Sequence, residues 1–480
     1  MRKWALLVAA TLAGCTTVGP DYREPDIRTP ARFAGSEPDG GLADAQLAHW
    51  WRTYGDSQLD TLVQRGLAQN LDVQTATARI REARAREIVA GAASQPQVNA
   101  QGSVTRQRIS ENAIPVPPGA GGGGSSFGLP GAEFTTFRVG FDASWEIDLF
   151  GRTQRSVEAA RARSGQALWN RRDVQVSVAA EVADAYFQLR TLQERIATAE
   201  AELARQERFE RLVGARVKGG LVSGQDLEQQ KSERSAAAAA LPALRAETEA
   251  QIHALGVLTG DSPEALIGAL SRPAALPLAP PSIPAGLPSD LLRRRPDIRY
   301  AERELAASTA EIGVAVADLY PRFSLTAAPA LVSTALGSLL EWGSRSFSAG
   351  AAVDWPLFNG GRTRGNIAVA DARQEAALIA YRKSVLRALQ DVEDALSRID
   401  GDRGRLGDLD QAVQTAARAE DIARTRYRGG LVAYSDVLLA QARRLMLEDQ
   451  VIETRGVLAR DSVALFKALG GGWTELGAQP

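Results

Sequence analysis

The chain carries one long pattern of residues twice, at an interval of 210 positions. Trp145 and Gly151-Arg152-Thr153 recur as Trp355 and Gly361-Arg362-Thr363, and Lys218-Gly219-Gly220-Leu221-Val222 recurs as Arg428-Gly429-Gly430-Leu431-Val432. This interval is far longer than the roughly 20–50 residues of a solenoid repeat. The sequence therefore predicts an internal two-fold repeat, in which each copy is a large unit of several helices and strands.

The first copy is longer than the second by one loop. Asp72 and Pro96 match Asp297 and Pro321, but at an interval of 225 residues. The difference falls where the glycine-rich stretch 119–131 lies. This stretch does not end in Gly-Lys-Ser or Gly-Lys-Thr, so it does not predict a phosphate-binding loop.

Each copy contains a long stretch with apolar residues at heptad spacing, which is typical of coiled coils. We expect long helices over 151–217 and 361–427, each ended by Gly-Gly, and returning helices over 225–258 and 435–469. From Thr363 to Arg426 such a helix is about 96 Å long, at about 1.5 Å per residue. The pattern therefore predicts a mainly helical protein with coiled-coil hairpins, and a scaffold without a channel remains an alternative at this point.

Four strands are expected, over 98–108, 134–147, 323–332 and 347–357. Phe137, Val139 and Phe141 alternate with polar residues, so one face is apolar and the other polar. A length of about ten residues suits a tilted membrane strand, although a half-buried sheet in water has the same alternation. Four strands cannot close a barrel, which needs about eight. Membrane strands would thus have to be pooled with copies of the chain, in a dimer or a larger ring.

The only cysteine, Cys15, follows a basic start, a short apolar run and Leu12-Ala13-Gly14. The run is too short to span a bilayer, and it is typical of a signal peptide over residues 1–14. The junction Leu-Ala-Gly-Cys resembles the bacterial lipobox, in which the cysteine becomes the first mature residue and carries lipid. Thr16 follows it, and by resemblance to sorting signals the absence of an aspartate there favours the outer membrane.

Composition argues against an enzyme. The chain has only two histidines, His49 and His253, so a His-rich metal site is excluded and a His-based triad is disfavoured. No catalytic residue, metal site or cofactor site is expected. The 56 Lys and Arg residues nearly balance the 57 Asp and Glu residues, so no nucleic-acid partner is indicated.

Several motifs in order resemble the TolC/OprM family of outer-membrane efflux channels, in its lipidated branch. They are Val18-Gly19-Pro20-Asp21-Tyr22, Trp50-Trp51, Asn70-Leu71-Asp72-Val73, the stretch 291–308 (LLRRRPDIRYAERELAAS), the stretch 312–321 (IGVAVADLYP) and the two Gly-Gly-Leu-Val turns. The resemblance implies a homotrimer with a β-barrel in the outer membrane and an α-barrel through the periplasm. It also implies a periplasmic adaptor protein and an inner-membrane pump, most often of the resistance-nodulation-division type, as partners.

The resemblance also implies a periplasmic gate at the helix tips. Asp226, Tyr427 and Asp436 match the family's gate residues, and the turns Gly219, Gly220, Leu221 and Gly429, Gly430, Leu431 match the tips that contact adaptor or pump. Val432 and Leu439 depart from the family, which has an arginine and an aspartate there. The gate could instead use Arg216, Lys218 or Arg428. An alternative is that Asp226 and Asp436 only cap the returning helices.

The chain is thus divided into a signal peptide (1–14), a lipidated segment (15–56), a first repeat (57–286), a second repeat (287–470) and a tail (471–480). The expected function is a passive, gated exit duct for small toxic molecules. A channel for protein secretion and a structural envelope lipoprotein are the alternatives. The sequence does not identify the substrate.

Replacing Cys15 by Ser should abolish incorporation of labelled palmitate into the protein, because the lipid at a lipobox junction is attached through the cysteine thiol. Metabolic labelling followed by affinity purification measures this, with Thr16→Ser as the matched control. Undiminished labelling of the Cys15→Ser protein would show that the lipobox interpretation is wrong.

Overall fold

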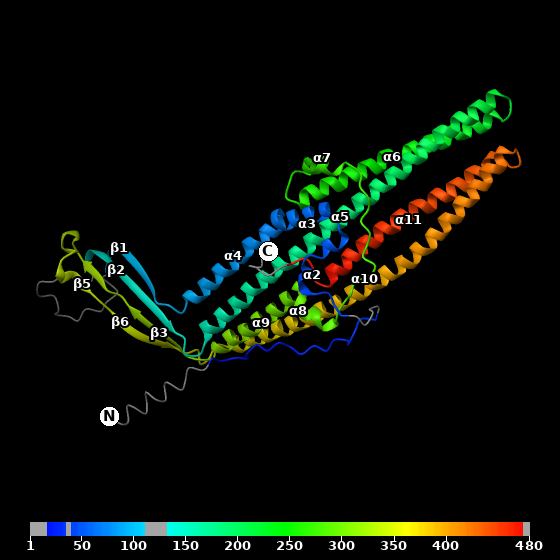
Figure 1. Ribbon diagram of the computed structural model, residues 1–480. Helices are drawn as coiled ribbons and strands as arrows, with labels where there is room; N and C mark the ends of the chain where they lie inside the picture. The colour runs from blue at the N-terminus through cyan, green and yellow to red at the C-terminus, as the bar shows by residue number, and fades with distance from the viewer. Residues whose placement is uncertain (1–16, 35–39, 111–131, 474–480) are drawn as a thin grey trace, which may run out of the picture. The chain divides into compact units, whose positions relative to one another are not determined.

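The computed structural model describes residues 17–34, 40–110 and 132–473 (Figure 1). Cys15, the signal segment 1–14 and the glycine-rich stretch 119–131 lie outside these residues. The described chain is mainly helical with one antiparallel sheet, which confirms the predicted fold class. It divides into two compact units. The sheet unit comprises the chain up to Glu24, Glu82–Ser164 and Glu304–Leu378, and the helical unit comprises the remainder.

The long helices repeat residue for residue. Helices α5 (Arg152–Lys218) and α10 (Arg362–Arg428) have 67 residues each, and α6 (Gly224–Leu258) and α11 (Tyr434–Ala468) have 35 each. Every end lies 210 residues from its counterpart and within one residue of the range expected from the sequence. Helices α4 (Leu71–Ala92) and α9 (Pro296–Ala317) repeat at the longer interval of 225. None of the described helices has a stretch apolar and long enough to cross a bilayer.

Shorter elements complete the helical unit. These are α2 (Asp44–Ala48), η1 (Trp50–Tyr54), α3 (Ser57–Gln69), η2 (Pro263–Leu266), α7 (Ile267–Leu270), η3 (Pro288–Asp290) and α8 (Leu291–Arg294). Trp50 and Trp51 in η1 are buried, and Trp50 stacks on Phe466 of α11 with ring centroids 5.0 Å apart. The paired tryptophans therefore serve the core of this unit.

In the sheet, the long strand β2 (Glu133–Ile147) pairs with β1 (Gln97–Arg108) along one edge. Its other edge pairs with β3 (Arg322–Ala327) and β4 (Ala330–Ser333). Strand β6 (Ala349–Asp354) pairs with β3, and β5 (Arg345–Ser346) pairs with β4. All pairings are antiparallel. Because β2 belongs to the first half of the chain and β3 and β4 belong to the second, the sheet joins strands from both halves.

The structure corrects the last two predicted strands, 323–332 and 347–357. The first is interrupted at Ala328-Pro329, because proline has no N–H to donate to the ladder. The carbonyl of Pro329 instead accepts a hydrogen bond from Phe141 N at 2.9 Å. The second is shortened to β6, which begins at Ala349 and ends before Pro356, and β5 lies just before the predicted range. The alternating pattern continues through Pro329 and past both ends of β6, which is why it predicts longer strands.

One face of the sheet is apolar and uncovered. The register places Val104 opposite Phe137, Ala100 opposite Phe141 and Trp145 opposite Leu325. Val139 and Phe141 remain 50% and 56% exposed. A sheet that packs on its own core would bury such residues, at a gain of about 1.5–3 kcal/mol for each large side chain. The described residues of the sheet unit leave this face without such a core.

Within the helical unit, α5 and α11 approach closely at a glycine. A β-carbon on Gly456 would lie 2.2 Å from Thr191 Oγ1 and 3.1 Å from Thr191 Cβ. Thr191 itself is held, because its hydroxyl donates to Phe187 O at 2.8 Å. Gly456 therefore allows the two helices to pack at this distance.

Substituting Gly456→Ala should destabilise the protein by about 1–3 kcal/mol, because the added methyl group overpacks the α5–α11 contact. Gly404→Ala, also within a long helix but with open space around it, should instead be neutral or stabilising by up to about 1 kcal/mol. Thermal unfolding in detergent measures both. Equal unfolding temperatures for the two variants would contradict the close approach at Gly456.

Candidate functional site

The two hairpins of the helical unit end in turns of the same geometry (Figure 1). Gly220 and Gly430 have φ of 68° and 71°, which favours glycine over residues with a side chain. Leu221 N donates to Arg216 O, and Leu431 N donates to Arg426 O, each at 2.9 Å. Leu221 and Leu431 are 72% and 77% exposed. Each turn therefore closes its helix internally and leaves a leucine on the surface.

The returning helices begin with different caps. Ser223 precedes α6, and its hydroxyl accepts a hydrogen bond from Asp226 N at 3.3 Å. Ala433 precedes α11 and donates its N–H to Asp436 Oδ2 at 3.2 Å. Asp226 and Asp436 thus lie in the first turn, where the helix dipole favours a carboxylate. Ser223 is the cap of α6, so capping does not account for the Asp226 side chain.

Three aromatic rings pack at the base of these turns and form the tip cluster: Phe209, Tyr427 and Tyr434. Tyr434 stacks on Phe209 at 5.3 Å between ring centroids and lies 5.4 Å from Tyr427. The guanidinium of Arg216 lies 5.2 Å from the centre of the Tyr427 ring, within range of a cation–π contact. Phe209 and Arg216 come from α5, so the cluster joins the two hairpins within one chain.

A chain of buried amides continues from the tip cluster between the hairpins. The Tyr434 hydroxyl donates to Gln230 Oε1, and Gln230 Nε2 donates to Gln206 Oε1 at 2.6 Å. Gln206 and Gln441 both donate to Glu202 Oε1, at 2.6 Å and 2.5 Å. Burial raises the pKa of Tyr434 well above its ordinary value, so its hydroxyl remains a neutral donor. The chain of hydrogen bonds ties α11 to both α5 and α6.

An ion pair recurs at the repeat interval on the same helices. Arg234 of α6 pairs with Glu210 of α5 at 2.9 Å, and Arg444 of α11 pairs with Glu420 of α10. The first pair is partly exposed, whereas the second is buried. The pKa of Glu420 is raised overall, because its burial outweighs the opposing charge of Arg424. Each hairpin therefore has an equivalent crosslink between its own two helices.

The residues expected from the sequence meet at this tip, but their side chains are not joined to one another. The Tyr427 hydroxyl is buried, and no described residue is its hydrogen-bond partner. The carboxylate of Asp226 likewise has no hydrogen-bond or ion-pair partner in the described part of the chain. Val432 packs on the tip cluster, and Leu439 is 74% exposed.

Tyr434 and the amides that bind it are not predicted by the sequence motifs. Gln206 and Gln230 interrupt otherwise apolar heptad positions, which is a signal that a search for buried polar residues could have used. The pairing itself depends on contacts between residues about 200 positions apart and has no local signal. Among the described residues, no cluster of His, Cys, Asp or Glu could hold a metal ion.

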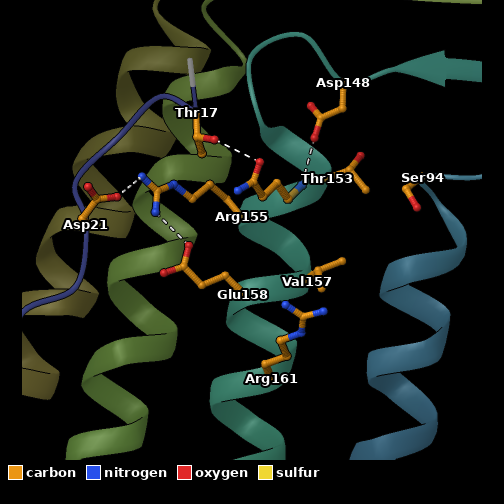
Figure 2. A pocket seen from close by; sticks show the side chains of 10 residues that line it. Thr17, Asp21, Ser94, Asp148, Thr153, Arg155, Val157, Glu158 and Arg161 are labelled. Atoms are coloured by element: carbon orange, nitrogen blue, oxygen red, sulfur yellow. Dashed lines mark hydrogen bonds and ion pairs between the residues drawn. The ribbon is translucent and has the colours of Figure 1, made fainter. Parts of the chain in front are cut away.

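A second feature lies in the sheet unit, where residues 17–21 form an N-terminal strap over the start of α5 (Figure 2). Arg155, whose side chain is 4% exposed, donates to Asp21 Oδ1 at 2.7 Å and to Glu158 Oε2 at 2.8 Å. It also donates to the carbonyls of Val18 and Gly19 at 3.1 Å and 3.2 Å. Val18 N donates to Phe150 O at 3.1 Å. The strap is therefore held by one buried guanidinium, which binds Val18, Gly19 and Asp21, and by one backbone hydrogen bond.

Substituting Arg155→Gln should loosen the N-terminal strap, because hydrogen bonds to charged groups contribute about 1.5–3 kcal/mol each. We expect hydrogen exchange over residues 17–24 to become at least about tenfold faster, equivalent to about 1.4 kcal/mol. Arg161→Gln, an exposed position on the same helix, is the matched control. Unchanged exchange in the Arg155 variant would contradict its role.

Comparisons with known proteins agree with this architecture. The family model described as outer membrane efflux protein matches residues 62–261 and 287–471. The chain is 32% identical over 474 residues to the pyoverdine export outer membrane protein OpmQ of Pseudomonas aeruginosa, covering 98% of this chain and 97% of that one. It is 30% identical to the cation efflux system protein CusC of Escherichia coli, with 98% of each covered. A solved structure of the outer-membrane channel OprN superposes with a TM-score of 0.85 at 34% identity, covering 95% of this chain and 99% of that one. The chain belongs to the outer membrane efflux protein family.

Proposed function

We propose that the chain is the outer-membrane channel of a tripartite efflux pump and serves as a passive, gated exit duct for small toxic molecules. Two structural features of this family member support the function. Its sheet has an uncovered apolar face, and its two long helical hairpins end in exposed turns. The energy for transport comes from the inner-membrane pump. Relatives of similar identity are named for pyoverdine export and for cation efflux, so this degree of identity does not select the cargo.

The working assembly we propose is a homotrimer. Strands β1 and β6 each have one edge without a partner among the described residues. An unpaired edge in lipid costs several kcal/mol for each unsatisfied backbone group. Copies of the chain would pair these edges and place the apolar face, with Val139 and Phe141, toward lipid. Three copies are the number that the resemblance to the TolC/OprM family implies.

The proposed placement in the cell follows from both ends of this assembly. Cys15 carries lipid in the outer membrane, and Arg155 holds the strap that follows it against the start of α5. The helical hairpins extend into the periplasm. Leu221 and Leu431, with the glycines that precede them, would contact the periplasmic adaptor and the pump, since apolar side chains exposed at a tip gain from burial against a partner.

The gate we propose consists of Asp226, Tyr427 and Asp436 at the hairpin tips. The Tyr427 hydroxyl and the Asp226 carboxylate lack partners within the described chain. The Tyr427 hydroxyl is also buried, and a buried unsatisfied group costs about 1–3 kcal/mol. In a ring of copies these groups would find partners on neighbouring chains. Such bonds would hold the tips together, and their loss would favour the open state.

Asp226→Ala combined with Tyr427→Phe should therefore raise the single-channel conductance in planar bilayers. Asp226→Asn should raise it nearly as much as Asp226→Ala, because it removes the charge and Ser223 already caps the helix. Glu228→Gln, which removes an exposed carboxylate that pairs with Lys231, is the matched control and should leave the conductance unchanged.

Two outcomes would count against the proposal. Conductance that is the same in every variant would mean that the constriction lies away from Asp226 and Tyr427. A detergent-solubilised protein with the mass of one chain, which nevertheless inserts in lipid and conducts, would contradict the pooling of strands.

A further inference from the structure

A cavity in the helical unit has a charge that the proposed channel function does not explain. It measures about 650 Å³ and lies where η1, α3, α4 and α5 meet. The charged side chains that line it are Arg52, Arg81 and Arg171, and no Asp or Glu is among its lining residues. His49 also lines it. A cavity lined by cations attracts an anion.

Two of these guanidinium groups have no carboxylate partner in the described part of the chain. The neighbouring Asp60 accepts from Trp51 Nε1 at 2.7 Å and pairs with Arg52 at 3.3 Å. Burial raises the pKa of Asp60, but these hydrogen bonds and one from Gln64 lower it below its ordinary value overall. Asp60 thus neutralises Arg52. Arg81 and Arg171 form no ion pair with any described residue.

Arg81 and Arg171 line the same cavity from neighbouring helices. Arg171 Nε of α5 donates to Thr77 Oγ1 of α4 at 3.0 Å, and Arg81 follows Thr77 by one helical turn. Burial lowers the pKa of Arg171, with no acidic group opposing the effect. Like charges on adjacent helices repel one another, and a bound anion would remove that cost.

Gln175 adds a requirement for a hydrogen-bond donor. It follows Arg171 by one turn of α5, lines the same cavity and is 8% exposed. Its Oε1 is buried, and no described residue donates to it. A ligand that satisfies all three side chains has negatively charged oxygens for the two arginines and one O–H group for the amide oxygen.

We propose that the cavity formed by Arg81, Arg171 and Gln175 binds a small oxyanion that carries an O–H group, of the class of hydrogen phosphate. Near pH 7.5 hydrogen phosphate keeps one O–H together with two negative charges. Sulfate has the same charge and shape but no O–H, and the phosphate group of a phosphate monoester also lacks one when fully ionised. The site therefore distinguishes free hydrogen phosphate from both.

Isothermal titration of the full-length protein in detergent with inorganic phosphate, at constant ionic strength and pH 7.5, tests the site. We expect saturable binding that is about tenfold or more tighter than binding of sulfate, since one hydrogen bond to a charged group contributes enough for such a ratio. Methyl phosphate, a monoester with no O–H group when fully ionised, should bind as weakly as sulfate in a parallel titration.

Arg81→Gln and Arg171→Gln should each weaken phosphate binding by about tenfold or more. Arg79→Gln, on the exposed face of the same helix α4, is the matched control for net charge and should bind phosphate as the unchanged protein does. Because Arg81 is exposed, its substitution leaves the fold intact even where that of Arg171 does not.

Absence of saturable binding, or equal weakening by Arg79→Gln, would overturn the proposal. Sulfate binding as tight as phosphate binding would overturn the role of Gln175 and with it the assignment to an O–H-bearing anion. None of these outcomes bears on conductance, so the site and the channel function are tested separately.

Discussion

The antiparallel contact between α5 and α11 is the interaction on which the rest of the helical unit depends. Arg460 pairs with Asp184 at 2.7 Å, Gly456 lies against Thr191, and Arg195 pairs with Asp449 at 2.7 Å. Closer to the tips, Gln441 of α11 donates a hydrogen bond to Glu202 of α5. These contacts follow one another in strict antiparallel order, so the register is constant over about five helical turns. Because each helix already belongs to its own hairpin, this single contact positions both tips.

The chemistry of that contact changes along its length. At one end it is apolar and tightly packed, with Phe187, Leu189 and Phe466 among the most buried side chains. Toward the tips it passes to amides and carboxylates, which bond through Glu202, Gln206 and Gln230. Apolar burial is lost wherever the helices separate, whereas buried polar groups can exchange their partners for water at a small net cost. The polar stretch between the apolar end and the tip cluster is therefore the part of the contact that costs least to separate, whereas the aromatic tip cluster resists separation.

The sequence predicts the helices better than the strands or the tip, for local reasons. Each long helix ends at a glycine that the turn requires, such as Gly220 or Gly430, and both copies carry the same signal. The strand pattern continues through Pro329, and only the missing N–H shows the break. Asp226 and Tyr427 could be placed at the tip by motif, but their lack of partners could not. Tyr434 bonds Gln230 across 204 positions, and only the α5–α11 register brings the two residues together.

The two copies keep the same contacts with different residues, which shows what the duplicated scaffold needs. Asn70 Nδ2 donates to Leu258 O, and Arg295 Nη1 donates to Ala468 O, each at 3.0 Å. These donors lie at equivalent repeat positions. Each donates to the carbonyl oxygen of the last residue of the returning helix in its own copy. Asn70 and Arg295 both lie in motifs that resemble the family. These two motifs therefore stabilise the fold and are not part of the proposed gate. At the tips both copies keep the Gly-Gly-Leu-Val turn, but Tyr434 in the second copy stands in place of Gly224 in the first. The duplication thus preserved the framework that holds the hairpins, while the residues that join the tips diverged.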